Sequence, residues 1–184
     1  LLGEIDLLLD RASGDVRESN ARNVVVRTDV FAKDEAQTRL IEAYERLSAP
    51  LARRVVGRLA APLLRDEGPA GESALGQVVA DAQLAATADA GAQLALMNPG
   101  GLRAALTGDA QGTVRYEDLF AAQPFSNALV TITLTGAQLR QVLEQQWAGQ
   151  ARPRLLQVSR GLSYAWDAAR PVGQRIVPGS LQLH

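Results

Sequence analysis

The chain has 184 residues, 47% of them hydrophobic and 21% charged, which is an ordinary globular composition. Its 19 basic and 20 acidic residues give a net charge of −1. This balance argues against a general nucleic-acid binder, because such a protein needs a basic face to displace counterions. The absence of cysteine excludes disulfides and thiolate metal sites, and the only histidine, His184, rules out histidine triads and multi-histidine metal centres.

The length of the chain fits one full domain with part of a second. The sequence opens on Leu1 rather than methionine, so we expect it to be part of a longer product. No run approaches the roughly 18 consecutive apolar residues of a membrane-spanning helix, and no membrane span is expected.

The first elements predicted are two strands, Glu4–Leu9 and Val24–Thr28, separated by a polar stretch rich in turn-forming residues. Asp34 can then cap a helix, with Gln37 three residues further on, and the apolar residues that follow recur at helical spacing. Pro50 should kink or restart this helix.

The larger part of the chain begins with a helix predicted over Ser73–Ala90. Ser73 is a suitable N-cap, and Gly91 stands where a helix would end. The short apolar run Gln93–Met97 is interpreted as a buried strand, which Asn98–Arg103 must end because of its proline and paired glycines.

In the second half, Tyr116–Ala121 indicates a helical turn and Ala128–Leu134 alternates as a strand does. Thr135 is expected to cap a helix that runs to Trp147. Three short strands are predicted after it: Leu155–Val158, Leu162–Trp166 and Arg175–Val177. The irregular order of helices and strands favours the α+β class, with a mixed sheet packed with helices.

The stretch from Asn98 to Arg103 is the most informative loop. Its glycines let the backbone approach a ligand and expose amide donors, while the flanking asparagine and arginine suit a sugar hydroxyl and an anion. The alternative is a turn that only leads the chain out of a strand. Local physics alone leaves both interpretations open.

A second candidate is the loop Pro124–Asn127. A phenylalanine held by a neighbouring proline can offer its ring face to a flat base, and such stacking contributes roughly 1–3 kcal/mol. The alternative is that Phe125 packs into the core beneath the loop.

The carboxylates do not indicate a catalytic site, because adjacent pairs such as Glu117-Asp118 diverge instead of converging on one site.

Five stretches together resemble the C-terminal domain of the 5′-nucleotidase family, of the UDP-sugar hydrolase and 2′,3′-cyclic phosphodiesterase type. Among them are an Asn-x-Gly-Gly-Leu-Arg loop, a Pro-Phe-x-Asn motif and a Leu-Thr-Gly helix start. In chain order the stretches are Gly71–Ala82, Asn98–Arg103, Pro124–Asn127, Leu134–Glu144 and Gln157–Asp167.

The resemblance extends over Gly57–Leu183 and implies how the chain is organised. Residues 57–184 would form the 5′-nucleotidase C-terminal domain, truncated at its C-terminal end. Residues 34–56 look like the interdomain helix, and residues 1–33 look like the hairpin that ends the family's metallophosphatase domain. The implied fold is α+β, 5′-nucleotidase C-terminal-domain-like.

The family's catalysis is not expected in this chain. In the family, the N-terminal domain holds two divalent metal ions through histidine-containing motifs that do not occur here. The chain alone should therefore bind no metal or other cofactor and hydrolyse nothing. Its parent would be a periplasmic, cell-surface or extracellular hydrolase of nucleotide phosphoesters. The implied partners are a nucleotide or nucleoside and the metallophosphatase domain in the same protein, with no nucleic acid.

By position, the resemblance implies six substrate-binding residues: Asn98, Gly100, Gly101, Arg103, Phe125 and Asn127. Phe125 would stack on the base, while Asn98 and Asn127 would contact base or sugar. Arg103 would meet the phosphate, and the two glycines would shape the loop between these contacts.

Two departures from the family pattern weaken the expected binding. Many members carry an arginine where this chain has Gly71, so one phosphate contact is expected to be missing. The family's second stacking aromatic lies in a Gly-Gly-Asp-Gly-aromatic loop that the sequence does not reach. We therefore expect only weak nucleoside binding by this chain.

Two alternative interpretations of function remain. The chain could be a non-catalytic nucleoside-binding module kept for sensing or surface attachment. It could also be the C-terminal domain of a related hydrolase with a non-nucleotide substrate, in which Phe125 only packs the fold.

Overall fold

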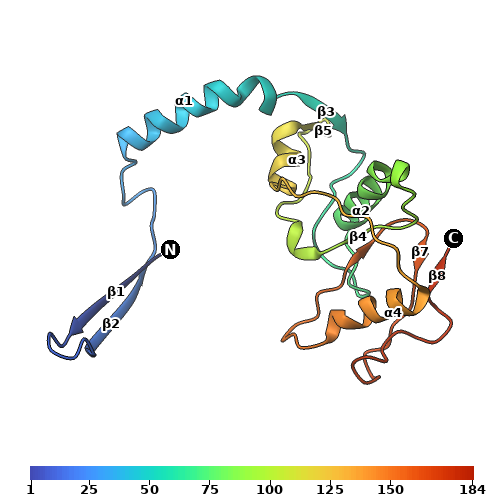
Figure 1. Cartoon of the computed structure of the whole chain (residues 1–184). Coiled ribbons are helices and arrows are strands. Elements are labelled where there is room, and N and C mark those ends of the chain that lie inside the picture. The colour runs from blue at the N-terminus through green and yellow to red at the C-terminus, as the bar shows by residue number, and fades with distance from the viewer. The chain divides into compact units, whose positions relative to one another are not determined.

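The computed structural model describes residues 1–184 and divides into two compact units, Leu1–Ala49 and Pro50–His184. The ribbon of each unit can be followed by colour in Figure 1. The family resemblance predicted divisions after residues 33 and 56, and these boundaries stay a prediction.

The first unit begins with a hairpin of β1 (Leu2–Leu9) and β2 (Val16–Val24), which pair antiparallel. The turn between them is tight, because the Asp10 carboxylate accepts hydrogen bonds from the amides of Ala12 and Ser13. The prediction of a second strand at Val24–Thr28 was therefore wrong. The strand β2 could not be predicted, because its residues are mostly polar and are exposed on both faces. They leave no alternation of apolar and polar residues to detect.

The helix α1 (Glu35–Ala52) follows the hairpin and buries none of its residues. Its predicted cap is confirmed, since Asp34 Oδ1 accepts the amide of Gln37 at 2.8 Å. Pro50 lies in the last turn, and the helix ends two residues after it. No helix of the chain has both the length and the apolar character that crossing a membrane requires.

The second unit combines short helices with short strands. Its helices are α2 (Ala74–Ala86), α3 (Tyr116–Ala122) and α4 (Gly136–Glu144), with 3₁₀ turns at Ala88–Ala90, Pro99–Gly101 and Gln145–Trp147. Its strands are β3 (Val55–Arg58), β4 (Leu96–Met97), β5 (Thr113–Arg115), β6 (Gln157–Val158), β7 (Leu162–Ser163) and β8 (Gln182–Leu183). The pairs β3–β5, β4–β6 and β7–β8 are all antiparallel. The predicted α+β class is confirmed, with the strands distributed over small pairs.

Local capping determines where the helices begin. Ser73 Oγ accepts the amide of Gly76 at 3.0 Å at the start of α2. At α4, Thr135 and Gln138 form a reciprocal capping box, in which each side chain accepts the other's amide. Both predicted caps are therefore confirmed. The α-helix α2 ends at Ala86, and a 3₁₀ turn continues it to the predicted end.

Two apolar clusters form the core of this unit. The first lies around α2, β4 and the loop after β4, and consists of Leu75, Ala80, Met97, Leu102, Leu106, Val114 and Ala122. The second joins α4 to the last strands and consists of Leu143, Trp147, Leu155 and Ile176. Trp166 packs against Trp147 of the second cluster, with ring centroids 5.5 Å apart.

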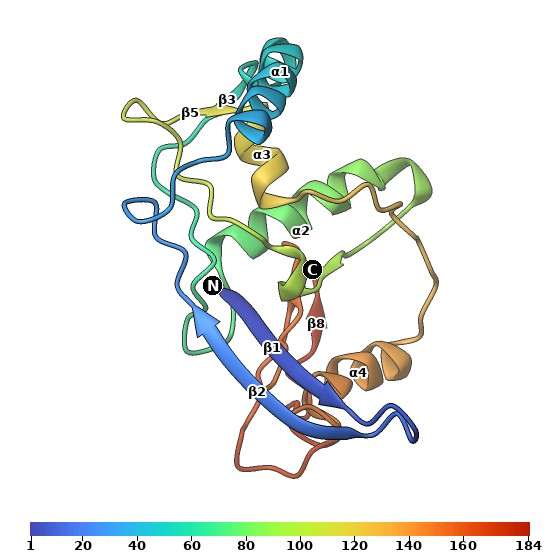
Figure 2. The same cartoon turned by 90° about the vertical axis from the view of Figure 1, so that its left-hand side faces the viewer.

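The predicted strand at Ala128–Leu134 is absent. Figure 2 shows this segment as an arc of irregular ribbon that joins α3 to α4. No backbone hydrogen bond joins it to the rest of the chain, and Val130 is 82% exposed. Alternation describes the two faces of a strand, but a strand also needs a partner for its amides and carbonyls, and no strand of this chain pairs with the segment.

Candidate functional site

The first part of the site is the loop that leaves β4. Pro99–Gly101 forms a 3₁₀ turn, in which the amide of Gly101 donates to the Asn98 carbonyl at 3.1 Å. Proline suits the first position of such a turn because its φ is already helical and its missing amide is not needed there. Asn98 caps the turn with its backbone alone, so its side-chain amide makes no capping hydrogen bond.

A side chain on Gly101 would force the end of the Met97 side chain to move. Gly101 is buried, and a Cβ atom on it would lie 2.2 Å from Cε of Met97. The thioether of Met97 is itself held, because Gln83 Nε2 donates to its sulfur at 3.2 Å. The glycine therefore lets the loop lie directly on the first core cluster.

The second part is the loop that leaves α3. The helix ends at Ala122, Gln123 is its C-cap, and Pro124 prevents its continuation. Phe125 follows and is 48% exposed, and it has no aromatic partner. This exposure does not agree with the alternative that Phe125 packs into the core beneath the loop. Asn127, two residues on, is exposed as well.

Two hydrogen bonds join these loops. The amide of Arg103 donates to the Ala122 carbonyl at 2.9 Å, and Gln123 Nε2 donates to the Gly101 carbonyl at 2.6 Å. Sequence reasoning missed Gln123. A glutamine before a proline has no local signature of such a role, since its partner lies 22 residues away in the chain.

Both loops open onto one cavity of about 900 Å³. Its lining includes Asn98, Gly100, Gly101, Phe125 and Asn127, so the structure brings five of the six predicted residues together. The remainder of the wall comes from α2 and the loop after it, β4, the segment before α4, α4 itself and β8, and it mixes apolar side chains with polar ones such as Gln83 and Gln93. The cavity therefore combines apolar wall residues with polar groups that could orient a ligand, as small-molecule sites do.

Arg103 does not line the cavity. Its Nη1 lies 3.4 Å from the Gly100 carbonyl, and its own carbonyl accepts a hydrogen bond from Arg65 Nη1 at 3.0 Å. None of the ion pairs in the chain involves Arg103, so no carboxylate compensates its charge. An exposed and uncompensated guanidinium next to the loop is suited to an anionic group of a ligand.

The position before Glu72 has no room for a side chain. Gly71 has φ +84, and a Cβ atom on it would lie 2.1 Å from Cδ1 of Leu155. Only glycine adopts such a φ routinely. The arginine that the resembling sequences often carry at this position therefore could not be accommodated in this backbone.

The groups with shifted pKa values lie outside the cavity. Burial raises the pKa of the Tyr164 hydroxyl above its usual value, although a hydrogen bond with Gln146 partly opposes this. Backbone amides, foremost that of Thr113, lower the pKa of Asp109. No three His, Cys, Asp or Glu side chains lie together as metal ligands would. The side chains at the two loops can stack and hydrogen-bond, which is the chemistry of recognition.

A family model described as "5′-nucleotidase, C-terminal domain" matches residues 55–184. Endonuclease YhcR of Bacillus subtilis is 30% identical over 166 residues, covering 90% of this chain and 13% of that protein. A cell wall protein of Listeria monocytogenes is 31% identical, over 86% of this chain and 21% of its own length. The chain thus spans only a small part of these relatives.

A solved structure agrees with these sequence matches. The crystal structure of a 5′-nucleotidase precursor from Thermus thermophilus aligns with a TM-score of 0.68 and 27% identity. The alignment covers 99% of this chain and 37% of that chain.

Proposed function

The chain belongs to the 5′-nucleotidase C-terminal domain family, and on that premise we propose that it recognises the substrate of a metal-dependent nucleotide phosphoester hydrolase. The observation that carries the proposal is the shared cavity between the two loops. A half-exposed aromatic ring and two asparagine side chains line this cavity together. They suit a nucleoside, which offers one flat base for stacking and several hydroxyls for hydrogen bonds.

In this proposal each side chain has a distinct task. Phe125 stacks on the base, and Asn98 and Asn127 hydrogen-bond base or sugar. Gly100 and Gly101 keep the loop thin enough for close approach. The support for these tasks is the position of all five residues on the cavity wall and the exposure of the Phe125 ring.

Arg103 takes the phosphate in this proposal. The guanidinium lies beside the cavity instead of in its wall, which fits a group that projects from a bound nucleoside toward solvent. Its charge is free of carboxylate partners, and charge-assisted hydrogen bonds to phosphate are among the stronger ones available to a protein.

The hydrolytic step belongs to another domain of the same protein. The residues of this chain do not fit a pair of catalytic metal ions, because they offer one histidine, no cysteine and no cluster of carboxylates. We assign the metal ions to a metallophosphatase domain in cis, and we expect the chain alone to release no phosphate. Exposed apolar side chains on the β1–β2 hairpin, such as Ile5 at 67%, support a neighbouring domain on that side.

We place the parent protein outside the cytoplasm, at the cell surface or in the periplasm or medium. The support is the Listeria relative, which is a cell wall protein. The second candidate is a nucleoside-binding module without catalysis. Phosphate release from AMP by the full-length parent, and its loss on metal chelation, separates the hydrolase from the module.

The test on this chain compares AMP with adenosine. In the variant Arg103→Gln, AMP should bind about tenfold more weakly while adenosine binding is unchanged, because only AMP carries the phosphate. Arg160→Gln is the matched control, since Arg160 has a side chain that is 90% exposed and pairs with Asp81 outside the cavity. NMR titration suits weak binding. Equal losses for both ligands, or none for AMP, would refute the role given to Arg103.

A further inference from the structure

We infer that Gln123 is a positioning residue. It holds the Asn98–Arg103 loop and the Phe125 loop together, so that residues of both loops can contact the same nucleoside. The inference rests on the proposed function. It adds a residue that neither the loop motifs nor the composition singled out. Gln123 also lies in the cavity wall, and the role assigned to it is to hold the two loops in place.

Gln123 lies where the two loops meet. It is the C-cap of α3, where its own amide donates to the Leu119 carbonyl at 2.9 Å, so the helix fixes its backbone. Its side chain reaches across and donates to the Gly101 carbonyl at 2.6 Å. Pro124 and Phe125 follow directly, so any shift of Gln123 is passed to the aromatic ring.

This side-chain hydrogen bond acts on the part of the loop that has the least freedom. Gly101 is buried against Met97, and its carbonyl is the acceptor that Gln123 takes up. Asn98 and Gly100, on the same turn, are exposed and line the cavity. Fixing Gly101 therefore fixes the direction in which the exposed residues of the turn point.

A backbone bond supports the same arrangement. The amide of Arg103 donates to the Ala122 carbonyl, the residue before Gln123, at 2.9 Å. The two bonds together join the end of α3 to both ends of a three-residue stretch. Loops held in their binding geometry before the ligand arrives lose less entropy on binding, and the affinity rises accordingly.

The experiment measures adenosine binding by NMR titration of the 184-residue chain. Gln123→Met keeps the length of the side chain but removes the donor, and it should weaken binding about tenfold, as expected for one lost hydrogen bond of this kind. Gln123→Lys restores a donor of similar reach and should recover most of the affinity. Adenosine carries no phosphate, so the added charge does not attract it.

Gln77→Met is the matched control, since Gln77 is exposed on α2 and does not line the cavity. Thermal unfolding should change little in all three variants. If the unaltered chain binds adenosine and Gln123→Met binds it equally well, the inference about Gln123 is wrong and the proposed function stands. If the unaltered chain binds no nucleoside, the proposed function fails and the inference fails with it. If Gln123→Met unfolds, the test depends on Gln123→Lys. An adenosine affinity of Gln123→Lys near that of the unaltered chain supports the positioning role. A tenfold loss of affinity in a folded Gln123→Lys chain contradicts it.

Discussion

The side-chain carbonyl of Gln157 accepts the backbone amide of Ser73 at 2.8 Å, across 84 residues of sequence. Gln157 is 1% exposed, and its Nε2 donates to the Gly71 carbonyl at 2.9 Å. The buried side-chain amide of Gln157 thus provides a hydrogen-bond partner for one backbone N–H and one backbone carbonyl at the start of α2. This contact joins the helix to β6, which pairs with β4 below the candidate site.

The first prediction concerns this contact. Gln157→Leu should lower the free energy of unfolding by about 2–4 kcal/mol, because it leaves a buried amide and a buried carbonyl without partners. Urea unfolding followed by circular dichroism measures the change. Gln77→Leu, an exposed position on α2, should stay within about 0.5 kcal/mol. A similar loss in both variants would contradict the role of the buried amide.

A second prediction separates backbone strain from steric conflict at Gly71. Gly71→Ala should cost about 3 kcal/mol of folding free energy, because the Cβ atom meets Leu155 and φ is positive. Gly173 has φ +88, but a Cβ atom on it would meet nothing within 4 Å, so Gly173→Ala should cost only about 1 kcal/mol. Equal costs in denaturant unfolding would mean that Leu155 does not close the position.

The third prediction concerns acid stability. Hydrogen bonds from the amides of Thr113 and Gln111 lower the pKa of Asp109 in the folded chain. Its carboxylate therefore stabilises the fold above the pKa of an unfolded aspartate, about 4, and this contribution is lost as the pH falls through the lower folded-state pKa. Asp109→Asn should be less stable than the unaltered chain near neutral pH, and the difference should shrink in acid.

Thermal unfolding across a pH series measures this difference. Asp66→Asn, which changes an exposed loop carboxylate without hydrogen bonds, serves as the control and should show no comparable trend. A stability difference for Asp109→Asn that stays constant from neutral to acidic pH would contradict the account.

The fourth prediction concerns the segment before α4. Backbone amides of residues 125–134 form no hydrogen bonds in the chain, so they should exchange with solvent at nearly unprotected rates. Amides within α4, such as that of Leu143, should exchange much more slowly. Hydrogen exchange followed by NMR resolves both groups. Slow exchange throughout Ala128–Leu134 would show that the segment is paired.

Signals that act over a few residues were predictable from the sequence. The caps at Ser73 and Thr135 depend on a side chain and an amide three residues later, and both are present as expected. The two candidate loops were found for the same reason, since each contains its own proline and its own polar residues.

Features that depend on distant partners were not predictable. The strand β5 was missed because three residues paired with β3 leave no periodicity to detect. The segment Ala128–Leu134 alternates, but alternation cannot show that a partner is missing. The contact of Gln123 with Gly101 depends on how two loops fold against each other, which no local pattern encodes.

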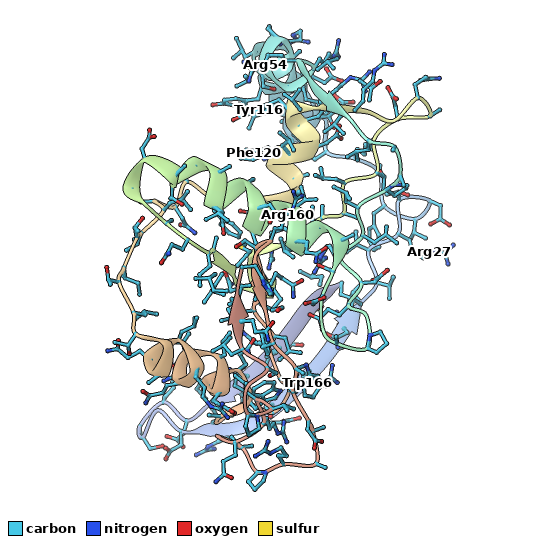
Figure 3. All side chains as sticks on the ribbon, turned by 90° about the vertical axis from the view of Figure 1, so that its right-hand side faces the viewer. Arg27, Arg54, Tyr116, Phe120, Arg160 and Trp166 are labelled. Atoms are coloured by element: carbon cyan, nitrogen blue, oxygen red, sulfur yellow. The ribbon has the colours of Figure 1, made fainter.

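The measurement that tests the central claim most directly is adenosine binding by Phe125→Ala. If Phe125 stacks on the base, its removal should weaken binding about tenfold, which is about 1.4 kcal/mol. Phe120 lies on α3 (Figure 3). It is the matched control, because it is 56% exposed but does not line the cavity. Phe120→Ala should bind as the unaltered chain does. A folded Phe125→Ala variant with unchanged affinity would contradict the account.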